Sequence, residues 1–322
     1  MDEFSFINTI RQDRYSQPSL VKGIGDDAAV FRTQEDVVTA VDTFVEGVHF
    51  SKKTMSPYQT GYRALAANLS DLAAMGARPV FYLVSIVIPK TWKLNELEEI
   101  FHGMKALARN HHMDLIGGDT VSGSELSISV TVIGYVDQDM ARFRHTAKPD
   151  DLVFVTGTLG DARAGLHLLT EDRESAYKNV AFFKKRHQMP MPRLEFALKL
   201  ADIDRVTLND VSDGIANEAN EIAEASNVCL TLYDKEIPTS KDFGQFSVTM
   251  QHEWKYFGGE DFELLGTVAE KNWNALVKAA KDSGVQLTKI GFVTNTNKEP
   301  AVYVIENDTK ARLDKKGYTH LK

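Results

Sequence analysis

The chain has 322 residues, of which 43% are hydrophobic and 25% charged, and its formal net charge is −8. This composition is typical of a globular protein of about two domains, and it excludes wholesale disorder. Acidic residues outnumber basic ones by 45 to 37, which argues against bulk nucleic-acid binding, because such binding depends on neutralising phosphates with Lys and Arg.

The sequence also lacks the marks of secreted and membrane proteins. No stretch approaches the roughly 20 apolar residues of a membrane helix, and the acidic start, Met1–Phe4, does not resemble a secretory signal. The single cysteine, Cys229, excludes internal disulfides and a cysteine-based zinc site, and it is expected to be a small buried side chain. We therefore expect a cytoplasmic location.

Hydrophobic periodicity predicts alternating strands and helices in the first half of the chain. Val37–Val41 predicts a strand that ends at Asp42. Ser56 and Pro57 are typical of a helix start, and apolar spacing continues this helix to Gly76, with Asp71 on its face of small residues. The next expected elements are a strand over 81–88, a helix over 94–108 and a strand over 127–136.

The second half mixes the same two kinds of element. Ala147–Asp150 is the best boundary candidate, which gives domains over 1–147 and 148–322. The basic run Lys184–His187 predicts a solvated face. Strands are expected over 152–156, 229–233, 285–293 and 301–305, and helices over 162–169, 193–201, 215–225 and 269–283. The whole pattern indicates an α/β or mixed α+β protein.

Aspartates recur at glycine turns and strand ends. Asp27 and Asp119 each follow a glycine-rich stretch, and Asp210 and Asp213 flank Ser212 before a helix. Any one of them fits an ordinary cap or turn. If they converge, two carboxylates about 4 Å apart would repel by ~4 kcal/mol at an effective dielectric near 20, so the cluster would need cations. Oxygen ligands alone select Mg²⁺ or Mn²⁺, and Mg²⁺ completes its shell with substrate phosphates.

The common nucleotide and hydrolase motifs are absent from the sequence. It contains no Walker P-loop, no Gly-x-Gly-x-x-Gly after a strand, no His-Glu-x-x-His and no Gly-x-Ser-x-Gly. The Walker, Rossmann, protein-kinase, metalloprotease and α/β-hydrolase interpretations therefore lose support.

Seven segments resemble the thiamine-monophosphate kinase family, in that family's order and over nearly the whole chain. They are 23–30, 41–50, 68–77, 117–120, 158–161, 210–214 and 258–265. The resemblance implies a two-domain aminoimidazole ribonucleotide synthetase-like fold whose N-terminal domains pair in a homodimer, with ATP bound near the interface. It also implies Mg²⁺-dependent transfer of a phosphoryl group from ATP to thiamine monophosphate, giving thiamine diphosphate.

The resemblance carries roles to individual positions. Those that match magnesium ligands are Asp27, Asp42, Asp71, Asp119, Asp210 and Asp213, and four of these (Asp42, Asp71, Asp119 and Asp210) would act in catalysis. Those that match nucleotide contacts are Phe101, Gly118, Asp119, Arg142 and Ser212, and those that match substrate contacts are His49, Glu260 and Tyr318. Phe101 fits core packing equally well, His49 fits a structural role near a turn, and the family often has Trp or Phe at the position of Tyr318.

Two alternatives stay open at this point. The first is another ATP-using enzyme of the superfamily, such as a purine-pathway synthetase. The second is a non-catalytic regulator that binds a nucleotide or a thiamine phosphate. Selenide water dikinase and the hydrogenase maturation protein are less suitable, because the chain lacks a cysteine near its N-terminus and ends in His320-Leu321-Lys322.

Overall fold

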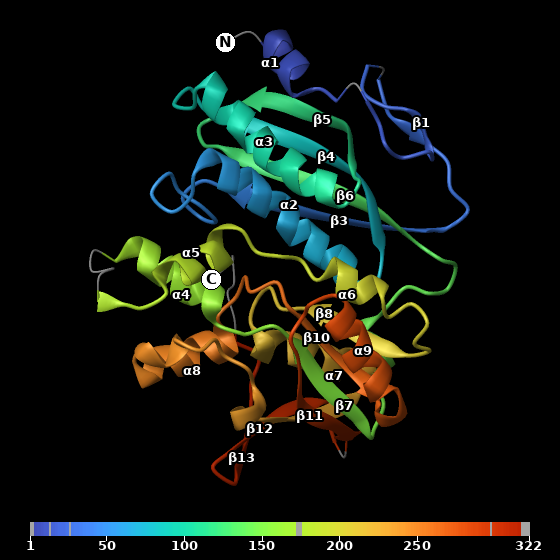
Figure 1. The fold of residues 1–322 in the computed structure, drawn as a ribbon, viewed down its shortest axis with the longest axis vertical. Coiled ribbons are helices and arrows are strands. Elements are labelled where there is room, and N and C mark those ends of the chain that lie inside the picture. Colours follow the sequence, from blue (N-terminus) through green and yellow to red (C-terminus); the bar gives the residue numbers. More distant parts are fainter. Residues whose placement is uncertain (1–2, 13, 26, 172–175, 297, 317–322) are drawn as a thin grey trace. The chain divides into compact units, whose positions relative to one another are not determined.

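The computed structural model describes residues 3–12, 14–25, 27–171, 176–296 and 298–316. The chain forms two compact units (Figure 1). The first comprises Met1–Leu72 and Ala77–Ala141, and the second comprises Ala73–Gly76 and Arg142–Lys322. None of the described helices has the length and apolar character needed to cross a membrane.

The first unit is built around a four-stranded sheet of order β3-β6-β4-β5. Its elements are α1 (Glu3–Ile10), β1 (Leu20–Lys22), β2 (Val30–Phe31), β3 (Asp36–Val45), α2 (Pro57–Ala74), β4 (Arg78–Ile88), α3 (Leu94–Asn110), β5 (Asp114–Ser122) and β6 (Ser127–Val136). The predicted strands and helices of this half are confirmed. The predicted start of α2 is also correct, since Ser56 and Gln59 exchange side-chain-to-backbone hydrogen bonds as a capping box.

Two strands of this sheet continue through aspartates that were expected at strand ends or glycine turns. β3 continues past Asp42 to Val45, and β5 continues through Gly117, Gly118 and Asp119 to Ser122. β5 extends because it pairs in parallel with β4 as far as Ile88 and Ser122, and this pairing outweighs the poor strand propensity of glycine and aspartate. Asp42 and Asp119 therefore lie within strands rather than at their ends.

Helices α2 and α3 cover one face of the sheet (Figure 1). The side chains beneath them are buried, among them Val84, Ile86, Val130 and Val132. The two helices approach closely at Gly61 and Gly103, since a Cβ on Gly103 would lie 1.9 Å from the carbonyl oxygen of Tyr58.

The substitution Gly103→Ala is expected to lower the free energy of unfolding by about 1–3 kcal/mol, because the added methyl group forces α2 and α3 apart. Urea denaturation of the variant measures this loss. Gly244→Ala is the matched control, since a Cβ there meets nothing within 4 Å. An equal loss in both variants would contradict the close-packing argument.

The opposite face of the sheet is only partly covered. Near Phe81 and Tyr135 it packs under the β1–β2 segment. Beyond that patch, Val41 is 61% exposed, and Thr43 and Ser85 are exposed as well. The exposed part of this face, which includes Val41, Thr43 and Ser85, is the open face.

The second unit is built around a seven-stranded sheet of order β13-β12-β9-β11-β7-β10-β8. Its strands are β7 (Asp151–Thr156), β8 (Val206–Asp210), β9 (Val228–Tyr233), β10 (Leu264–Ala269), β11 (Leu287–Asn295), β12 (Ala301–Glu306) and β13 (Thr309–Arg312). Its helices are α4 (Asp161–Thr170), α5 (Val180–Gln188), α6 (Leu194–Leu198), α7 (Ile215–Ser226), α8 (Val248–Phe257) and α9 (Trp273–Asp282). Short 3₁₀ turns cover Arg144–Thr146, Asp234–Glu236, Phe243–Gln245 and Glu270–Asn272.

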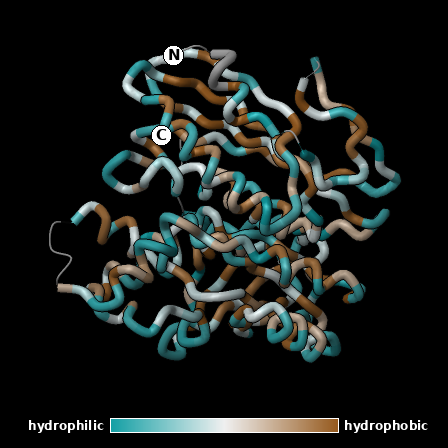
Figure 2. The backbone as a smooth tube through the Cα atoms, turned by 45° about the horizontal axis from the view of Figure 1, so that its top comes forward, coloured by the Kyte–Doolittle hydropathy of each residue, from teal (hydrophilic) through white to brown (hydrophobic). Residues whose placement is uncertain are grey.

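The main core of this unit lies between α7 and the sheet. Ile215, Ala219 and Ile222 of α7 pack with Val155 and Leu230 of the strands. A separate aromatic cluster joins α4, α5 and α8. In Figure 2, hydrophobic residues are frequent along the strands, whereas many connecting loops are hydrophilic.

Most predicted elements of the second half are confirmed, and Cys229 is buried as expected. The prediction of a solvated face at Lys184–His187 is wrong for half of the run. Arg186 binds buried carboxylates and His187 is 2% exposed, because α5 turns these two residues inward. A run of adjacent basic residues does not reveal which of them the 3.6-residue helical period buries.

Candidate functional site

The turn between β8 and α7 brings several carboxylates together. Asp210 ends β8 and is 3% exposed, and Asp213 precedes Gly214 at the start of α7. Glu218 of α7 reaches back to this turn, where it accepts hydrogen bonds from Asn209 Nδ2 at 2.5 Å and from the Asp213 amide at 3.2 Å. Burial, followed by the charge of Asp210, raises the pKa of Glu218 to about 7.

This environment fits a hard cation. Carboxylates held together out of water repel one another, and a divalent ion with oxygen ligands removes that repulsion. Among the described residues, however, no group of three His, Cys, Asp or Glu side chains has an arrangement ready to hold a metal ion. The fit therefore rests on the chemistry of the donors and on the raised pKa of Glu218.

A second segment, 258–263, lies directly against this turn. The Glu260 amide donates to the Ser212 carbonyl at 2.7 Å, and the Phe262 amide donates to the Val211 carbonyl at 3.0 Å. The Val211 amide donates in turn to the Glu263 carbonyl at 2.7 Å. The approach requires glycine at 259, since a Cβ there would lie 2.5 Å from the Ser212 carbonyl oxygen.

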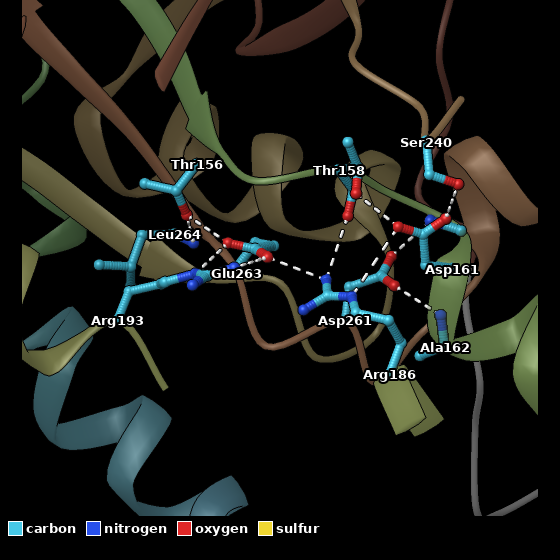
Figure 3. Close-up of polar contacts among 11 residues, drawn as sticks. Thr156, Thr158, Asp161, Ala162, Arg186, Arg193, Ser240, Asp261, Glu263 and Leu264 are labelled. Carbon is cyan, nitrogen blue, oxygen red and sulfur yellow. Dashed lines mark hydrogen bonds and ion pairs between the residues drawn. The ribbon is translucent and has the colours of Figure 1, made fainter. Parts of the chain in front are cut away.

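Glu263 lies at the centre of a buried ionic network (Figure 3). Its carboxylate is 0% exposed and binds Arg193 through two contacts, Nε at 2.6 Å and Nη2 at 2.5 Å. Arg186 Nη2 donates to it at 2.9 Å, and the Thr156 hydroxyl at 2.7 Å. Burial alone would raise the pKa of Glu263, but Arg193 and Arg186 outweigh burial and hold the pKa below its ordinary value.

Arg186 extends the network to two further carboxylates, Asp161 and Asp261 (Figure 3). Asp161 lies 3.8 Å from Arg186 Nε, and Asp261 accepts hydrogen bonds from the amides of Gly160 and Ala162 at the start of α4. Burial raises the pKa of Asp261 to about 7, and it raises the pKa of Asp161 as well, although Arg186 opposes both shifts. The network thus ties segment 258–263 to α4 and α5.

In the first unit, the structure brings Asp42 and Asp71 to one region. The Asp42 amide on β3 donates to Asn68 Oδ1 on α2 at 3.1 Å. Asp71 follows Asn68 by three residues, so the two share a helix face. Asp42 and Asp71 therefore lie on adjoining elements, β3 and α2, on the covered side of the sheet.

Asp119 is separated from this pair. In the register of the sheet, Asp119 shares a row with Ser85, Ser129 and Thr43, whereas Asp42 falls in the neighbouring row. Because successive rows point to opposite faces, Asp119 belongs to the open face. The two residues also lie on opposite edge strands, about 14 Å apart at a strand spacing of about 4.8 Å. Within one chain they do not meet.

Comparisons with known proteins agree with the domain pattern. Residues 25–136 match the family described as AIR synthase related protein, N-terminal domain, and residues 148–304 match its C-terminal domain. A thiamine-monophosphate kinase of Bacillus subtilis (strain 168) is 43% identical over 327 residues, which cover 100% of both chains. The chain belongs to the thiamine-monophosphate kinase family.

Solved structures of the thiamine-monophosphate kinase family share this fold. The kinase from Stenotrophomonas maltophilia K279a superposes with a TM-score of 0.83 at 33% identity, covering 94% of this chain and 96% of its own. AaThiL complexed with AMPPCP and TMP gives a TM-score of 0.78 at 29% identity, with 93% and 92% covered. The predicted aminoimidazole ribonucleotide synthetase-like fold is thereby confirmed.

Several positions matched to the kinase family have defined surroundings. His49 Nδ1 accepts a hydrogen bond from the Val45 amide at 3.1 Å, and its ring lies 5.3 Å from that of Phe44. Arg142 is buried and its Nη2 donates to the carbonyls of Leu200 and Ala201.

The other matched positions differ in exposure. Phe101 is 2% exposed on the inner face of α3, Asp27 and Gly118 are exposed, and Tyr318 lies outside the described residues. Glu260 carries a positive φ of 71° and its side chain is 34% exposed, with Oε2 at 3.9 Å from His187 Nδ1.

Sequence reasoning missed Glu218, Arg186 and Arg193, which surround the turn 210–213 and hold segment 258–263 against it. Glu218 lies one helical turn after Gly214, on the side of α7 that faces the turn, and this spacing was the available signal. The two arginines gave no signal, because their partner Glu263 is 70 or more residues away in the sequence.

Proposed function

We propose that this protein transfers the terminal phosphoryl group of ATP to thiamine monophosphate, giving ADP and thiamine diphosphate. The observation that carries the proposal is the full-length similarity to thiamine-monophosphate kinases. The Bacillus subtilis relative is 43% identical, and the aligned residues cover 100% of both chains. A relative of the same fold was solved with AMPPCP, a non-hydrolysable ATP analogue, and TMP. These relatives favour the kinase over the purine-pathway alternative.

The chemistry explains why no catalytic base is needed. The acceptor is a phosphate monoester whose second pKa is near 6, so its oxygen is largely deprotonated at pH 7. The obstacle is repulsion between two polyanions, and phosphoryl transfer is mostly positioning and charge neutralisation. Bound Mg²⁺ would supply that neutralisation. We propose direct in-line attack, so that no covalent phosphoprotein forms during turnover.

The proposal assigns this work to both of the domains expected from the sequence. We propose that residues 1–147 bind ATP and metal and form the dimer, and that residues 148–322 complete the site. Proposed to hold metal are Asp27, Asp42, Asp71, Asp119, Asp210 and Asp213. Proposed nucleotide contacts are Phe101, Gly118, Arg142 and Ser212, and proposed substrate contacts are His49, Glu260 and Tyr318. Because ATP is the donor, a cytoplasmic location is part of the proposal.

A homodimer built on the open face is also part of the proposal. This face exposes Val41, Thr43 and Ser85, which are small or β-branched side chains suited to packing against a second sheet. Asp119 belongs to the same face and cannot meet Asp42 within one chain. Pairing of two such faces would place Asp119 at an interface, as a shared site requires.

The proposed function is tested by incubating the protein with ATP and thiamine monophosphate, with and without Mg²⁺. We expect thiamine diphosphate and ADP in equal amounts, and loss of turnover in excess chelator. Labelled ATP with a panel of acceptors separates the kinase from a purine-pathway enzyme. Binding of both ligands without release of ADP would instead indicate a regulator.

A further inference from the structure

Segment 258–263 and the turn 210–213 form one backbone unit. Three hydrogen bonds of 2.7–3.0 Å join Glu260, Phe262 and Glu263 to Val211 and Ser212. The ladder continues directly into the pairing of Leu264 with Asp210. The position of the proposed metal-binding turn is therefore set by the position of Glu263 and its neighbours.

The backbone conformation of this segment needs support from outside. Glu260 and Phe262 both have a positive φ, 71° and 50°, a region that side-chain-bearing residues rarely adopt. Such strain of about 1–3 kcal/mol per residue persists only where the surroundings enforce it. Asp261 lies between these two residues and Glu263 follows them. Both side chains point inward, and their buried polar contacts hold the strained backbone in place.

The strongest anchor is the two-pronged contact between Arg193 and Glu263. A guanidinium binds a carboxylate through two parallel hydrogen bonds and so fixes both distance and orientation, which a lysine ammonium does not. Thr156 completes the anchor, since its hydroxyl donates to Glu263 and accepts from the Leu264 amide at 2.8 Å. Glu263 is therefore fixed by side chains from β7 and from the start of α6.

We propose that Arg193, acting through Glu263, is a positioning residue for the turn 210–213, and that it sets the affinity of Asp210 and Asp213 for divalent metal. This inference rests on the proposed function, which assigns metal to that turn. The new element is that Arg193, whose contacts are with Glu263, controls how tightly Asp210 and Asp213 bind the metal.

The test is Arg193→Lys, which keeps the positive charge and removes the two-pronged contact. Binding of Mn²⁺ to the protein without nucleotide, measured by calorimetry, is expected to weaken about 10-fold. The KM for thiamine monophosphate is expected to rise through Glu260, whereas kcat at saturating metal changes less than about threefold.

Arg205→Lys is the matched control. Arg205 makes the same kind of two-pronged contact with Asp151, a buried carboxylate at the opposite end of β7. Arg205→Lys is expected to lower the free energy of unfolding by about as much as Arg193→Lys does, but to leave the Mn²⁺ affinity within about twofold of wild type. If Arg193→Lys is not recovered folded, Arg186→Lys is measured against the same criteria.

The outcomes separate the two proposals. Wild-type protein that neither binds Mn²⁺ nor phosphorylates thiamine monophosphate would overturn the proposed function. A wild type that does both, together with a folded Arg193→Lys variant of unchanged Mn²⁺ affinity, would overturn only the positioning role. Equal weakening in Arg193→Lys and Arg205→Lys would also overturn it, because the effect would then be one of general stability.

Discussion

Replacing Asp210 by Asn is expected to lower kcat/KM for thiamine monophosphate by roughly 100- to 1,000-fold, the scale seen when one charge-stabilising group is removed from an active site. The substitution preserves side-chain size and the strand pairing of residue 210 with Leu264, so the fold should persist. The loss follows because the turn then offers one carboxylate fewer to a cation. Steady-state kinetics at several Mg²⁺ concentrations measure it.

Asp282→Asn is the control for this prediction. Asp282 ends α9, is exposed and belongs to none of the segments that match the kinase family. It should retain wild-type kinetics. An Asp210→Asn variant with more than a third of wild-type kcat/KM would remove Asp210 from the proposed metal ligands.

Replacing Arg186 by Met is expected to lower the free energy of unfolding by about 3–5 kcal/mol at pH 7.5, because three buried carboxylates then lose the cation between them. Arg186 lowers the pKa values of Asp161 and Asp261, so both pKa values should rise further in the variant. Urea denaturation of wild type and variant at several pH values measures the difference.

The pH dependence of this loss has a definite sign. Loss of Arg186 should raise the pKa values of Asp161 and Asp261 above their wild-type values, so the folded variant takes up protons at a higher pH than the folded wild type does. Because the pKa of Asp261 is already about 7 in the wild type, the deficit should shrink as the pH falls from 9 to 7. Arg163→Met, at an exposed position of α4, should cost little at either pH. A deficit that stays constant with pH would contradict the role of buried carboxylates.

The sequence was sufficient for the elements with strong periodicity. Val37–Val41, Ser127–Val136 and the helix from Pro57 were predictable because one face of each is apolar and their ends carry turn or capping residues. Asp119 was expected at a glycine turn or strand end, but it lies within β5, because its Gly-Gly-Asp segment becomes a strand through pairing with β4. Local propensity does not contain that pairing.

The candidate site was less accessible from sequence than the fold. The positions matched to the kinase family include Asp210 and Asp213, but not Glu218, Arg186 or Arg193, which determine the surroundings of that turn. Glu263 contacts Arg186 and Arg193 only after β7, β10 and α5 have packed together. The burial of these three charged side chains is therefore visible only in the structure. The opposite orientations of Asp42 and Asp119 likewise depend on strand register.

The chain crosses between its units more than once. The segment Ala73–Gly76, at the end of α2, belongs to the second unit. There the Met75 carbonyl accepts a hydrogen bond of 3.0 Å from the Arg142 amide. A fragment that begins at residue 142 would lack this turn and the hydrogen bond that joins it to Arg142. Cutting the chain once therefore cannot yield two intact halves, and any exchange of domains between relatives would have to transfer four residues from the middle of the first half as well.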